Sequence, residues 1–343
     1  MNINVLGIDI AKNVFQLHGA DGSGKKVLKK RIERNNLSEY IATLPSCTIV
    51  MEACGGSNYW ARTFQRHGHT VKLISPQFVK PFVKTNKNDA NDAEAIVEAG
   101  TRPSMHFVPI KQVEQQDIQS IHRVRSRLMK NKTALINEIR GLNLEYGITI
   151  PQGEAKVKRC LRSIIDDNKN ELTILSRGLM QDLYDELIEI EIKLKKLEKN
   201  IQIICKENDQ CRRILSIPGV GPLTSTAIVA AVPNANEFKN GRHMSAWLGL
   251  VPRQVSSGNK QVLLGISKRG DKYLRTLLIH GARSALSFTK HKDDPYGNWL
   301  IAKKESLTFN KAAVALANKN ARIIWSLLKT GDEFNRDKKM VAA

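Results

Sequence analysis

Two short apolar runs near the start of the chain each carry a single acidic residue. The first, residues 4–11, contains Asp9, and the second, residues 48–53, contains Glu52. Apolar runs of this length predict buried β-strands. A carboxylate inside such a strand is costly unless it is paired or holds a cation. The two runs therefore predict a sheet that carries functional acids.

The segments around these runs predict the rest of one α/β domain. We expect strands at 4–11, 14–18, 26–33, 48–53 and 70–75, and helices at 36–44, 55–66 and from Asp89 onward. The order βββαβαβα is that of ribonuclease H-like domains, in which the first and fourth strands are neighbours. Asp9 and Glu52 would then lie side by side on the sheet.

A second pair of acids begins the last helix of this domain. Asp89 and Asp92 are three residues apart, which places both side chains on one helical face. A plainer interpretation is an acidic first turn that the helix dipole favours. Together with Asp9 and Glu52, however, the pair makes a set of four carboxylates. Such a set suits one or two Mg²⁺ ions, which assist phosphodiester chemistry.

The charge of the chain favours a polyanionic partner. Its 343 residues include 54 Lys and Arg against 33 Asp and Glu, a formal charge of +21 that is spread along the sequence. Such a chain is poised to bind nucleic acid through a folded basic surface. Residues 7–11 also resemble the first phosphate motif of actin-like sugar kinases, but the sequence has no convincing second glycine-rich phosphate loop.

The sequence shows no sign of export or of a membrane span. Its start does not resemble a signal peptide, and no apolar stretch approaches the length of a spanning helix. Its five cysteines have neither zinc-like spacing nor the density of a disulfide scaffold. We expect reduced thiols, a cytoplasmic protein and no membrane partner.

The middle of the chain begins with a basic helix at 112–146. Its cationic face is formed by His122, Arg123, Arg125, Arg127, Lys130, Lys132 and Arg140. A charged face is usually only solvated, but in so basic a chain it favours contact with nucleic acid, at Arg123 and Arg127 in particular. Gly147 and Pro151 end the helix.

A heptad seam follows, in which apolar residues alternate steps of four and three. The seam consists of Leu183, Leu187, Ile190, Leu194, Leu197, Ile201 and Ile204, with Met180 upstream. It predicts either a helical hairpin with 112–146 in the same chain or a coiled coil between subunits. We favour the second interpretation, which makes the protein a homo-oligomer, a dimer to a tetramer.

Residues 214–228 match the helix-hairpin-helix pattern. The turn from Gly219 to Gly221 would present backbone N–H groups at a helix start, where they suit a DNA phosphate. Such a contact would add affinity without sequence preference. A role in packing alone is the alternative.

A polar loop within 245–260 contains two adjacent serines, Ser256 and Ser257. A serine hydroxyl is a poor nucleophile without activation, and no base lies nearby in the sequence. Cations in and after this loop would bind a phosphate. They are Arg253, Lys260, Lys268, Arg269 and, at a helix start, Arg275. Helices near 276–288 and 311–328 complete a mostly helical C-terminal part.

Several of these motifs together resemble a known family. They lie at 7–12, 51–53, 87–93, 217–221, 249–253, 257–258, 266–270 and 274–275. In this order, over about 1–330, they resemble the insertion-sequence transposases of the "one-ten" family, relatives of Piv-type DNA invertases. The resemblance implies a RuvC-like catalytic domain at 1–108, a helical coiled-coil region at 109–210, a transposase domain at 211–330 and a flexible tail at 331–343.

The resemblance also implies roles for individual residues. Asp9, Glu52, Asp89 and Asp92 occupy the four places of the family's Asp-Glu-Asp-Asp metal site. The family's nucleophilic serine precedes a glycine, which makes it Ser257 here. The neighbouring hydroxyl of Ser256 is not distinguished from it by chemistry.

The partners implied by the resemblance are nucleic acids and further copies of the chain. Family members work as tetramers on the DNA of element ends and targets, guided by a structured noncoding bridge RNA. Sequence choice would then lie in base pairing, while the protein reads shape and backbone. The expected location is the nucleoid of a prokaryotic cytoplasm.

These observations lead to one hypothesis and two rivals. In the hypothesis, Ser257 attacks a DNA phosphodiester, Mg²⁺ on the four acids assists, and serine and acids meet across a subunit interface. The first rival is a metal-only nuclease of the Holliday-junction type, in which Ser257→Ala would leave cleavage intact. The second is a nucleic-acid binder without catalysis, in which Asp9→Ala would change nothing.

Overall fold

A computed structural model describes residues 2–83, 89–258, 260–288 and 294–337, without the side chains of Asp89, Ala90 and Lys260. Its contacts divide the chain into two compact units, 1–113 and 114–343. The finer division into a coiled-coil region and a transposase domain stays a prediction. Of the helices in the described ranges, none combines the length and the apolar character that crossing a membrane requires.

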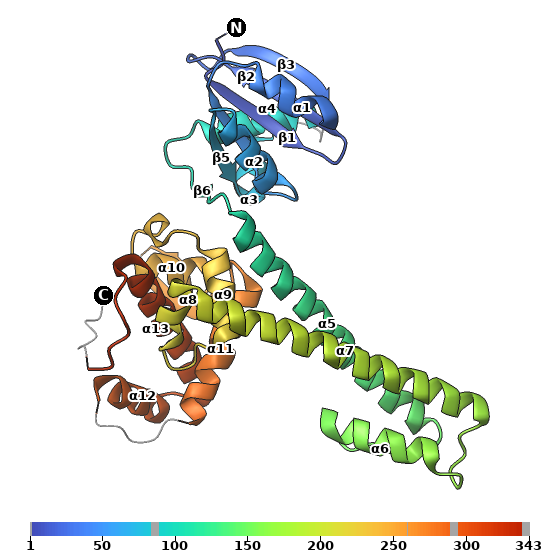
Figure 1. The fold of residues 1–343 in the computed structure, drawn as a ribbon. Helices are drawn as coiled ribbons and strands as arrows, with labels where there is room; N and C mark the ends of the chain where they lie inside the picture. Colours follow the sequence, from blue (N-terminus) through green and yellow to red (C-terminus); the bar gives the residue numbers. More distant parts are fainter. Residues whose placement is uncertain (1, 84–88, 259, 289–293, 338–343) are drawn as a thin grey trace. The chain divides into compact units, whose positions relative to one another are not determined.

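The first unit is a mixed α/β structure (Figure 1). Its strands are β1 Val5–Ile10, β2 Val14–Ala20, β3 Lys26–Glu33, β4 Thr48–Glu52, β5 Thr70–Ile74 and β6 Phe107–Val108. Its helices are α1 Arg34–Ala42, α2 Ser57–Arg66, α3 Pro76–Val79, a single 3-10 turn at Lys80–Phe82 and α4 Asp89–Gly100. The sheet order is β3-β2-β1-β4-β5-β6, so the first and fourth strands are neighbours, as we expected.

The sheet buries both faces, because its strands place apolar side chains alternately on either side. One face packs on α1 and α2, through Ile8, Phe15, Leu37 and Phe64 among others. The other face packs on α4, through Val5, Val50, Ile96 and Val97 among others. β1 pairs with β2 in antiparallel and with β4 in parallel register.

The second unit is mostly helical. Its helices are α5 Val113–Leu144, α6 Glu154–Asp166, α7 Ile174–Glu207, α8 Asp209–Leu215, α9 Pro222–Ala231, a 3-10 turn at Ala235–Glu237, α10 Gly241–Trp247, α11 Lys272–Ser287, α12 Pro295–Ser306 and α13 Phe309–Thr330. Its strands are β7 Pro252–Ser257 and β8 Lys260–Ile266. Several helices begin where sequence rules place a cap: the Thr173 hydroxyl accepts from the Ser176 N–H at the start of α7.

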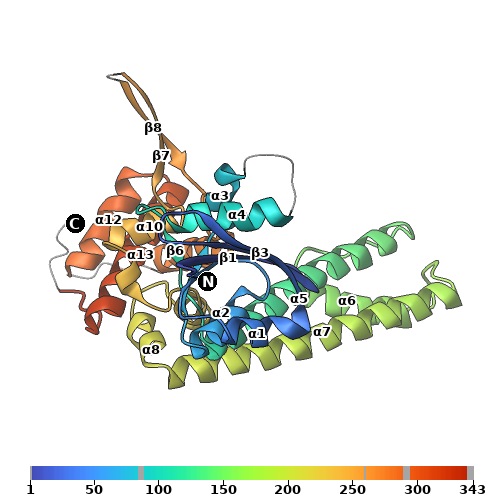
Figure 2. The same cartoon turned by 90° about the horizontal axis from the view of Figure 1, so that it is seen from above.

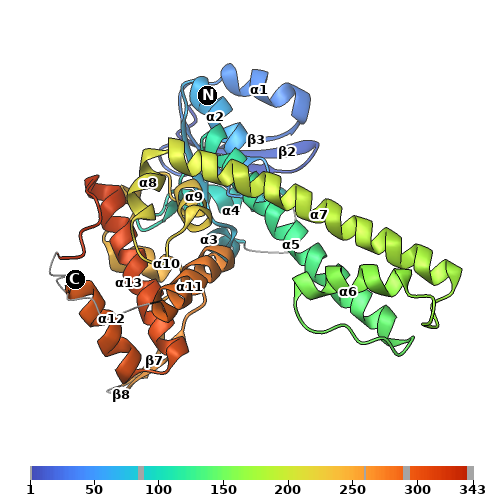
Figure 3. The same cartoon turned by 60° about the horizontal axis from the view of Figure 1, so that its bottom comes forward.

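The helices α5, α6 and α7 lie together, which corrects our view of the heptad seam (Figure 3). Leu187, Ile190 and Leu194 of α7 are buried in a cluster with residues of α5 and α6. Two ion pairs reinforce this packing: Arg125 to Glu198 at 2.8 Å, and Lys158 to Glu191 at 2.7 Å. The seam is therefore occupied within the chain, and our preference for a seam between subunits is wrong.

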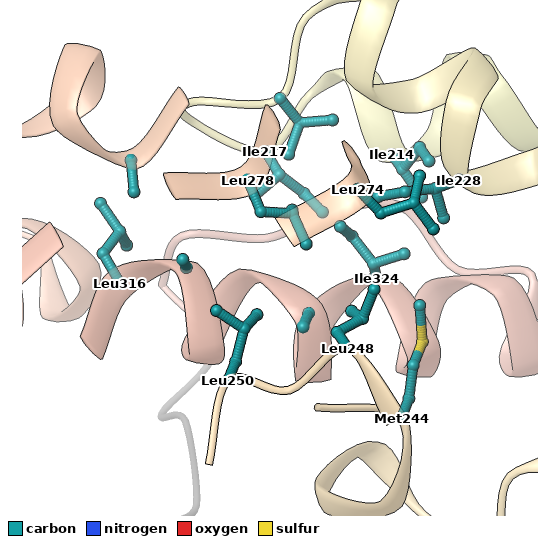
Figure 4. Packing of buried hydrophobic residues seen from close by; sticks show 14 of the residues in the cluster. Ile214, Ile217, Ile228, Met244, Leu248, Leu250, Leu274, Leu278, Leu316 and Ile324 are labelled. Atoms are coloured by element: carbon teal, nitrogen blue, oxygen red, sulfur yellow. The ribbon is translucent and has the colours of Figure 1, made fainter. Parts of the chain in front are cut away.

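The remaining helices enclose the largest core of the second unit. Apolar residues of α8, α9, α10, α11 and α13 meet there, as Figure 4 shows for Ile214, Ile228, Met244, Leu278 and Ile324. These side chains are fully buried or nearly so. This core holds α10 and α11, the helices that precede and follow the strands β7 and β8.

The strands β7 and β8 form a hairpin that extends away from the helices (Figure 2). We expected a polar loop here, so the paired strands are a correction. Every residue of β7 is exposed, and in β8 Leu263 is 67% exposed. β-branched residues such as Val255 and Val262 favour strands, and here they pair across the hairpin without packing on a hydrophobic core.

Candidate active site

A close approach of α4 to β1 places the predicted acids on one face of the sheet. A Cβ atom added to Gly7 would lie 2.5 Å from the carbonyl oxygen of Ala93 and 2.6 Å from Cγ2 of Val97. Only glycine allows the helix to lie this near to the strand. α4, which begins at Asp89, lies against β1 at Ala93 and Val97 as a result.

Strand register brings Asp9 and Glu52 to adjacent positions. Ile8 pairs with Met51 in the parallel ladder, and Asp9 and Glu52 each follow one residue later. Asp9 lies two residues after Gly7, and Glu52 lies two residues after Val50, which packs against α4. Because alternate side chains share a face, both acids face α4, and both are half-buried.

The electrostatics of these acids indicate that they share one environment. Burial raises the pKa of Glu52, and the neighbouring charge of Asp92 raises it further. Burial also raises the pKa of the Cys54 thiol, with added contributions from the charges of Glu52 and Asp9. Like charges gathered in this way disfavour ionisation unless a cation joins them.

The donor chemistry fits a hard divalent cation. The carboxylates of Asp9, Glu52 and Asp92 offer oxygen ligands. A bound cation would relieve the repulsion from Asp92 that adds to the effect of burial on the pKa of Glu52. Among the side chains that the structure describes, no three Asp, Glu, His or Cys residues close into a metal-binding group. The Asp89 side chain, the fourth expected ligand, lies outside the described residues.

The predicted nucleophile lies at the end of the β7–β8 hairpin. Ser257 is the last residue of β7, is exposed, and pairs with Lys260 across the turn at Gly258. The hairpin sequence from Pro252 to Ile266 contains no Asp, Glu or His. The hairpin therefore offers neither a carboxylate nor an imidazole as a general base for the serine.

The two adjacent serines differ in their surroundings. Gln254 Nε2 donates to Ser256 Oγ at 2.7 Å, and these two residues share one face of β7. Ser257 lies on the opposite face, with Val255. The Ser256 hydroxyl thus already accepts a hydrogen bond on the hairpin, a distinction that sequence reasoning did not find.

The predicted cations around the hairpin divide into exposed and buried groups. Arg253, Lys268 and Arg269 are exposed, and Lys268 adopts a φ of 55°. Arg275 is only 8% exposed, and its Nη1 donates to the carbonyls of Leu248 at 3.1 Å and Arg269 at 3.4 Å. The structure therefore favours a structural role for Arg275 at the hairpin base over the nucleic-acid contact that we expected.

The helix-hairpin-helix turn packs closely on α11. Gly219 has a φ of 87°, and a Cβ atom there would lie 2.6 Å from the carbonyl oxygen of Gly281. Asn320 Nδ2 donates to the Pro218 carbonyl at 2.9 Å. A Cβ atom at Gly221, in contrast, would meet open space. Packing thus explains Gly219, while a phosphate contact near Gly221 stays a prediction.

The basic face of α5 is exposed at the predicted positions. Arg123 and Arg127 lie one helical turn apart and are open to solvent. His122 and Lys132, which we expected on the same cationic face, are buried instead, and His122 contacts Tyr273 and Thr226. Sequence reasoning missed Cys54 beside the acids, although its proximity to Glu52 in sequence was a signal for it.

Comparison with known proteins identifies similar sequences over nearly the whole chain. Residues 211–297 match the transposase IS116/IS110/IS902 family, and residues 6–146 match a DEDD transposase domain of the IS110 type. A "Probable family 20 transposase" from Pseudomonas aeruginosa is 47% identical over 96% of this chain and 97% of its own length.

Two further relatives extend the comparison. The transposase for insertion sequence element IS1111A of Coxiella burnetii is 50% identical over 95% of this chain and 90% of its own length. A pilin gene-inverting protein of Moraxella bovis is 22% identical, over 81% of this chain and 82% of its own length.

Proposed function

Because the chain belongs to the IS116/IS110/IS902 family of transposases, we propose that it cuts and rejoins DNA strands through a phosphoserine intermediate. The observation that carries the proposal is the exposed Ser257 at the end of a hairpin with no acid or histidine of its own. A hydroxyl so placed is accessible to a DNA phosphate but needs activation from elsewhere in the protein.

The reaction at Ser257 exchanges one phosphodiester for another. The serine Oγ loses its proton and attacks the phosphorus of the scissile phosphodiester. The bond from phosphorus to one sugar oxygen breaks, and that oxygen leaves as a hydroxyl after it gains a proton. A hydroxyl of a second strand then attacks the phosphoserine and releases Ser257. Because each step conserves a phosphate ester, no ATP is required.

Mg²⁺ is the proposed cofactor of the acids. Asp9, Glu52 and Asp92 would hold it, with Asp89 as the fourth ligand, in a RuvC-like domain of the ribonuclease H type. The sheet order and the shared face of Asp9 and Glu52 support this assignment. When bound, Mg²⁺ supplies charge stabilisation to the scissile phosphate and to the leaving oxygen.

The serine and the acids belong to different parts of one catalytic assembly. Asp9 and Glu52 lie in the unit 1–113, while Ser257 lies in the unit 114–343. We propose that the serine of one subunit serves the acids of another in a homo-oligomer of up to four chains. The subunit contacts must use surfaces other than the heptad seam, since the seam is occupied within the chain.

The nucleic-acid partners follow from charge and family. Exposed Arg253, Lys268 and Arg269, together with Lys260, would bind phosphates near the serine. We propose that a bridge RNA pairs with the element ends and with the target and so selects the sites, in the nucleoid of the cytoplasm. The formal charge of +21 supports a protein that binds both nucleic acids through their backbones.

Covalent protein–DNA adducts test the proposal. The protein is expressed with the DNA that flanks its gene, cells are lysed in denaturant, and protein-linked DNA is counted. We expect adducts with wild type and with Ser256→Ala, and none with Ser257→Ala. Asp9→Ala should also abolish them.

The matched serine variants make the outcome decisive. Both remove one hydroxyl from the same exposed strand, so a difference between them is chemical and not a folding defect. Cut DNA without any adduct in wild type would leave a hydrolytic metal nuclease in place of the serine recombinase.

A further inference from the structure

The second unit contains a pocket that none of the predicted chemistry uses. It has a volume of about 350 Å³ and lies between α5, α9 and the start of α11. Its wall combines apolar side chains, a buried histidine and tyrosine, and a row of cations. Volumes of this size are typical of small-ligand sites with a few fixed polar groups.

The inner wall of the pocket is rigid and neutral. His122 is 4% exposed; its Nε2 lies 3.0 Å from Thr226 Oγ1, and its Nδ1 lies 2.9 Å from Tyr273 Oη. Thr226 already donates its proton to the Pro222 carbonyl at 2.7 Å. It must therefore accept from His122 Nε2–H, which leaves Nδ1 to accept from the tyrosine. This chain of hydrogen bonds fixes the orientation of both rings.

The rest of the inner wall is apolar. Ala227 and Ala231 of α9 and Leu274 of α11 line it, beside the ring of Tyr273. The His122 and Tyr273 rings meet edge to face, with centroids 5.6 Å apart. Small side chains next to an aromatic ring leave a surface on which a flat ring system can lie.

The rim of the pocket carries uncompensated positive charge. Arg123, Arg127 and Lys130 line it, at positions i, i+4 and i+7 of α5. No carboxylate in the described ranges pairs with these three side chains, whereas Arg125 and Lys132 of the same helix are both paired. Asp271, an acid of the lining, accepts from the Tyr273 and Leu274 N–H groups as the cap of α11.

We propose that this pocket binds one unstacked nucleotide of a single-stranded nucleic acid. Its base lies on Ala227, Ala231 and the Tyr273 ring, and its flanking phosphates contact Arg123, Arg127 and Lys130. A phosphate alone would use the rim and leave the apolar wall empty, whereas a nucleotide uses both. The inference rests on the proposed function only in taking a nucleic acid as the partner.

Single-strand binding by the full-length protein tests the pocket. Fluorescence anisotropy measures the affinity for labelled single-stranded DNA and, in a parallel arm, single-stranded RNA of the same sequence. Base stacking of the usual strength corresponds to roughly ten-fold or more in affinity per base. We expect Ala231→Leu, which fills the apolar wall, to weaken binding about ten-fold and to leave its salt dependence unchanged.

Charge variants at two exposed arginines give the matched comparison. Arg127→Gln removes a cation from the rim, and Arg159→Gln removes the same charge from the exposed surface of α6, outside the pocket and outside the cationic face of α5. We expect a loss of about ten-fold for the first and about two-fold or less for the second. Melting temperatures of all variants verify that they fold.

A strand with abasic sites separates nucleotide binding from phosphate binding. The proposal expects abasic strands to bind wild type about ten-fold more weakly than normal strands. Equal binding of abasic and normal strands, or equal losses for Arg127→Gln and Arg159→Gln, would overturn it. The arm that binds more tightly, DNA or RNA, identifies the source of the nucleotide. Because the binding assay needs no cleavage, its result is independent of the adduct assay. The pocket can fail its test while adducts form on Ser257, and it can pass its test when no adducts form.

Discussion

At the scale of single residues, the site depends on how each side chain is surrounded. Gly7 lets α4 reach the sheet, and the acids Asp9 and Glu52 thereby share a face with that helix. Ser256 and Ser257, adjacent in sequence, point to opposite faces of a strand, and Gln254 bonds only the first. The surroundings of each side chain, and not its residue type alone, therefore distinguish Ser257 from Ser256 and bring α4 close to Asp9 and Glu52.

His122 makes the stability of the protein dependent on pH. Burial lowers its pKa from 6.5 to about 4, with a smaller contribution from the charge of Arg125. The unfolded state therefore binds the proton first, so the contribution of His122 is complete above about pH 6.5 and is lost as pH falls toward 4. The loss should be on the order of 3 kcal/mol.

The free energy of unfolding, measured from pH 4 to pH 7, tests this prediction. The difference between wild type and His122→Asn should shrink as the pH falls. His280→Asn is the control, because His280 is exposed on α11 in the same unit. Parallel pH curves for wild type and His122→Asn would show that His122 does not titrate in this range.

Residue-level prediction placed Asp9 and Glu52 on neighbouring strands of the sheet, as the structure has them. A lone acid in an apolar run is costly to bury, which drew attention to both residues, and their catalytic role stays a prediction. Arg275 was misjudged because its burial depends on the carbonyls of Leu248 and Arg269, which come from other segments. Sequence also could not separate the two serines, since strand alternation matters only once the hairpin exists.

At the scale of elements, close backbone contact fixes the helix-hairpin-helix turn on α11. A Cβ atom at Gly281 would lie 1.8 Å from the carbonyl oxygen of Gly219. This contact joins the turn before α9 to the middle of α11, the helix whose start lines the nucleotide pocket. The turn and the pocket are thus parts of one packed structure.

Gly281→Ala should destabilise the protein although alanine favours helices. The clash with the Gly219 carbonyl should outweigh the gain in helix propensity, for a net loss of roughly 2 kcal/mol. Gly178→Ala is the matched control, because a Cβ atom there meets open space in α7, and it should gain up to about 1 kcal/mol. Denaturant unfolding measures both, and stabilisation by Gly281→Ala would rule out the close contact.

Element prediction was strongest in the first unit. Periodicity and turn residues located the five longer strands and the main helices of the sheet domain to within a few residues. The β7–β8 hairpin was not predicted, because its strands are exposed and do not pack on a core. Their sequence therefore lacks the alternation of buried apolar and exposed polar residues that indicates a strand. α6 was not predicted, because only two of its residues, Val157 and Leu161, are fully buried, and two apolar positions are too few to indicate a helical period.

At the scale of the whole molecule, the heptad seam packs within one chain. A heptad pattern predicts a partner helix but not whether the partner belongs to the same chain. Here α5 and α6 fill that role. The seam residues therefore do not require a partner subunit, and the composite site of Ser257 and the acids stays a proposal.

Leu187→Ala tests the seam within the chain. Leu187 is fully buried, so its truncation should cost about 3 kcal/mol in the free energy of unfolding. The loss should be the same at low and at high protein concentration. Ile192→Ala, on the same helix but 62% exposed, should change stability by less than about 0.5 kcal/mol. If the stability lost in Leu187→Ala returned at high protein concentration, the seam would lie between subunits.

The most direct test of the account is to identify the amino acid that is joined to DNA. Adducts from wild-type protein are digested with nuclease and protease, and the peptide that carries the nucleotide remnant is sequenced by mass spectrometry. We predict a remnant on Ser257 and none on Ser256, in amounts that fall to background when chelator removes divalent metal. A remnant on Ser256, on another residue, or undiminished by chelator would contradict the account.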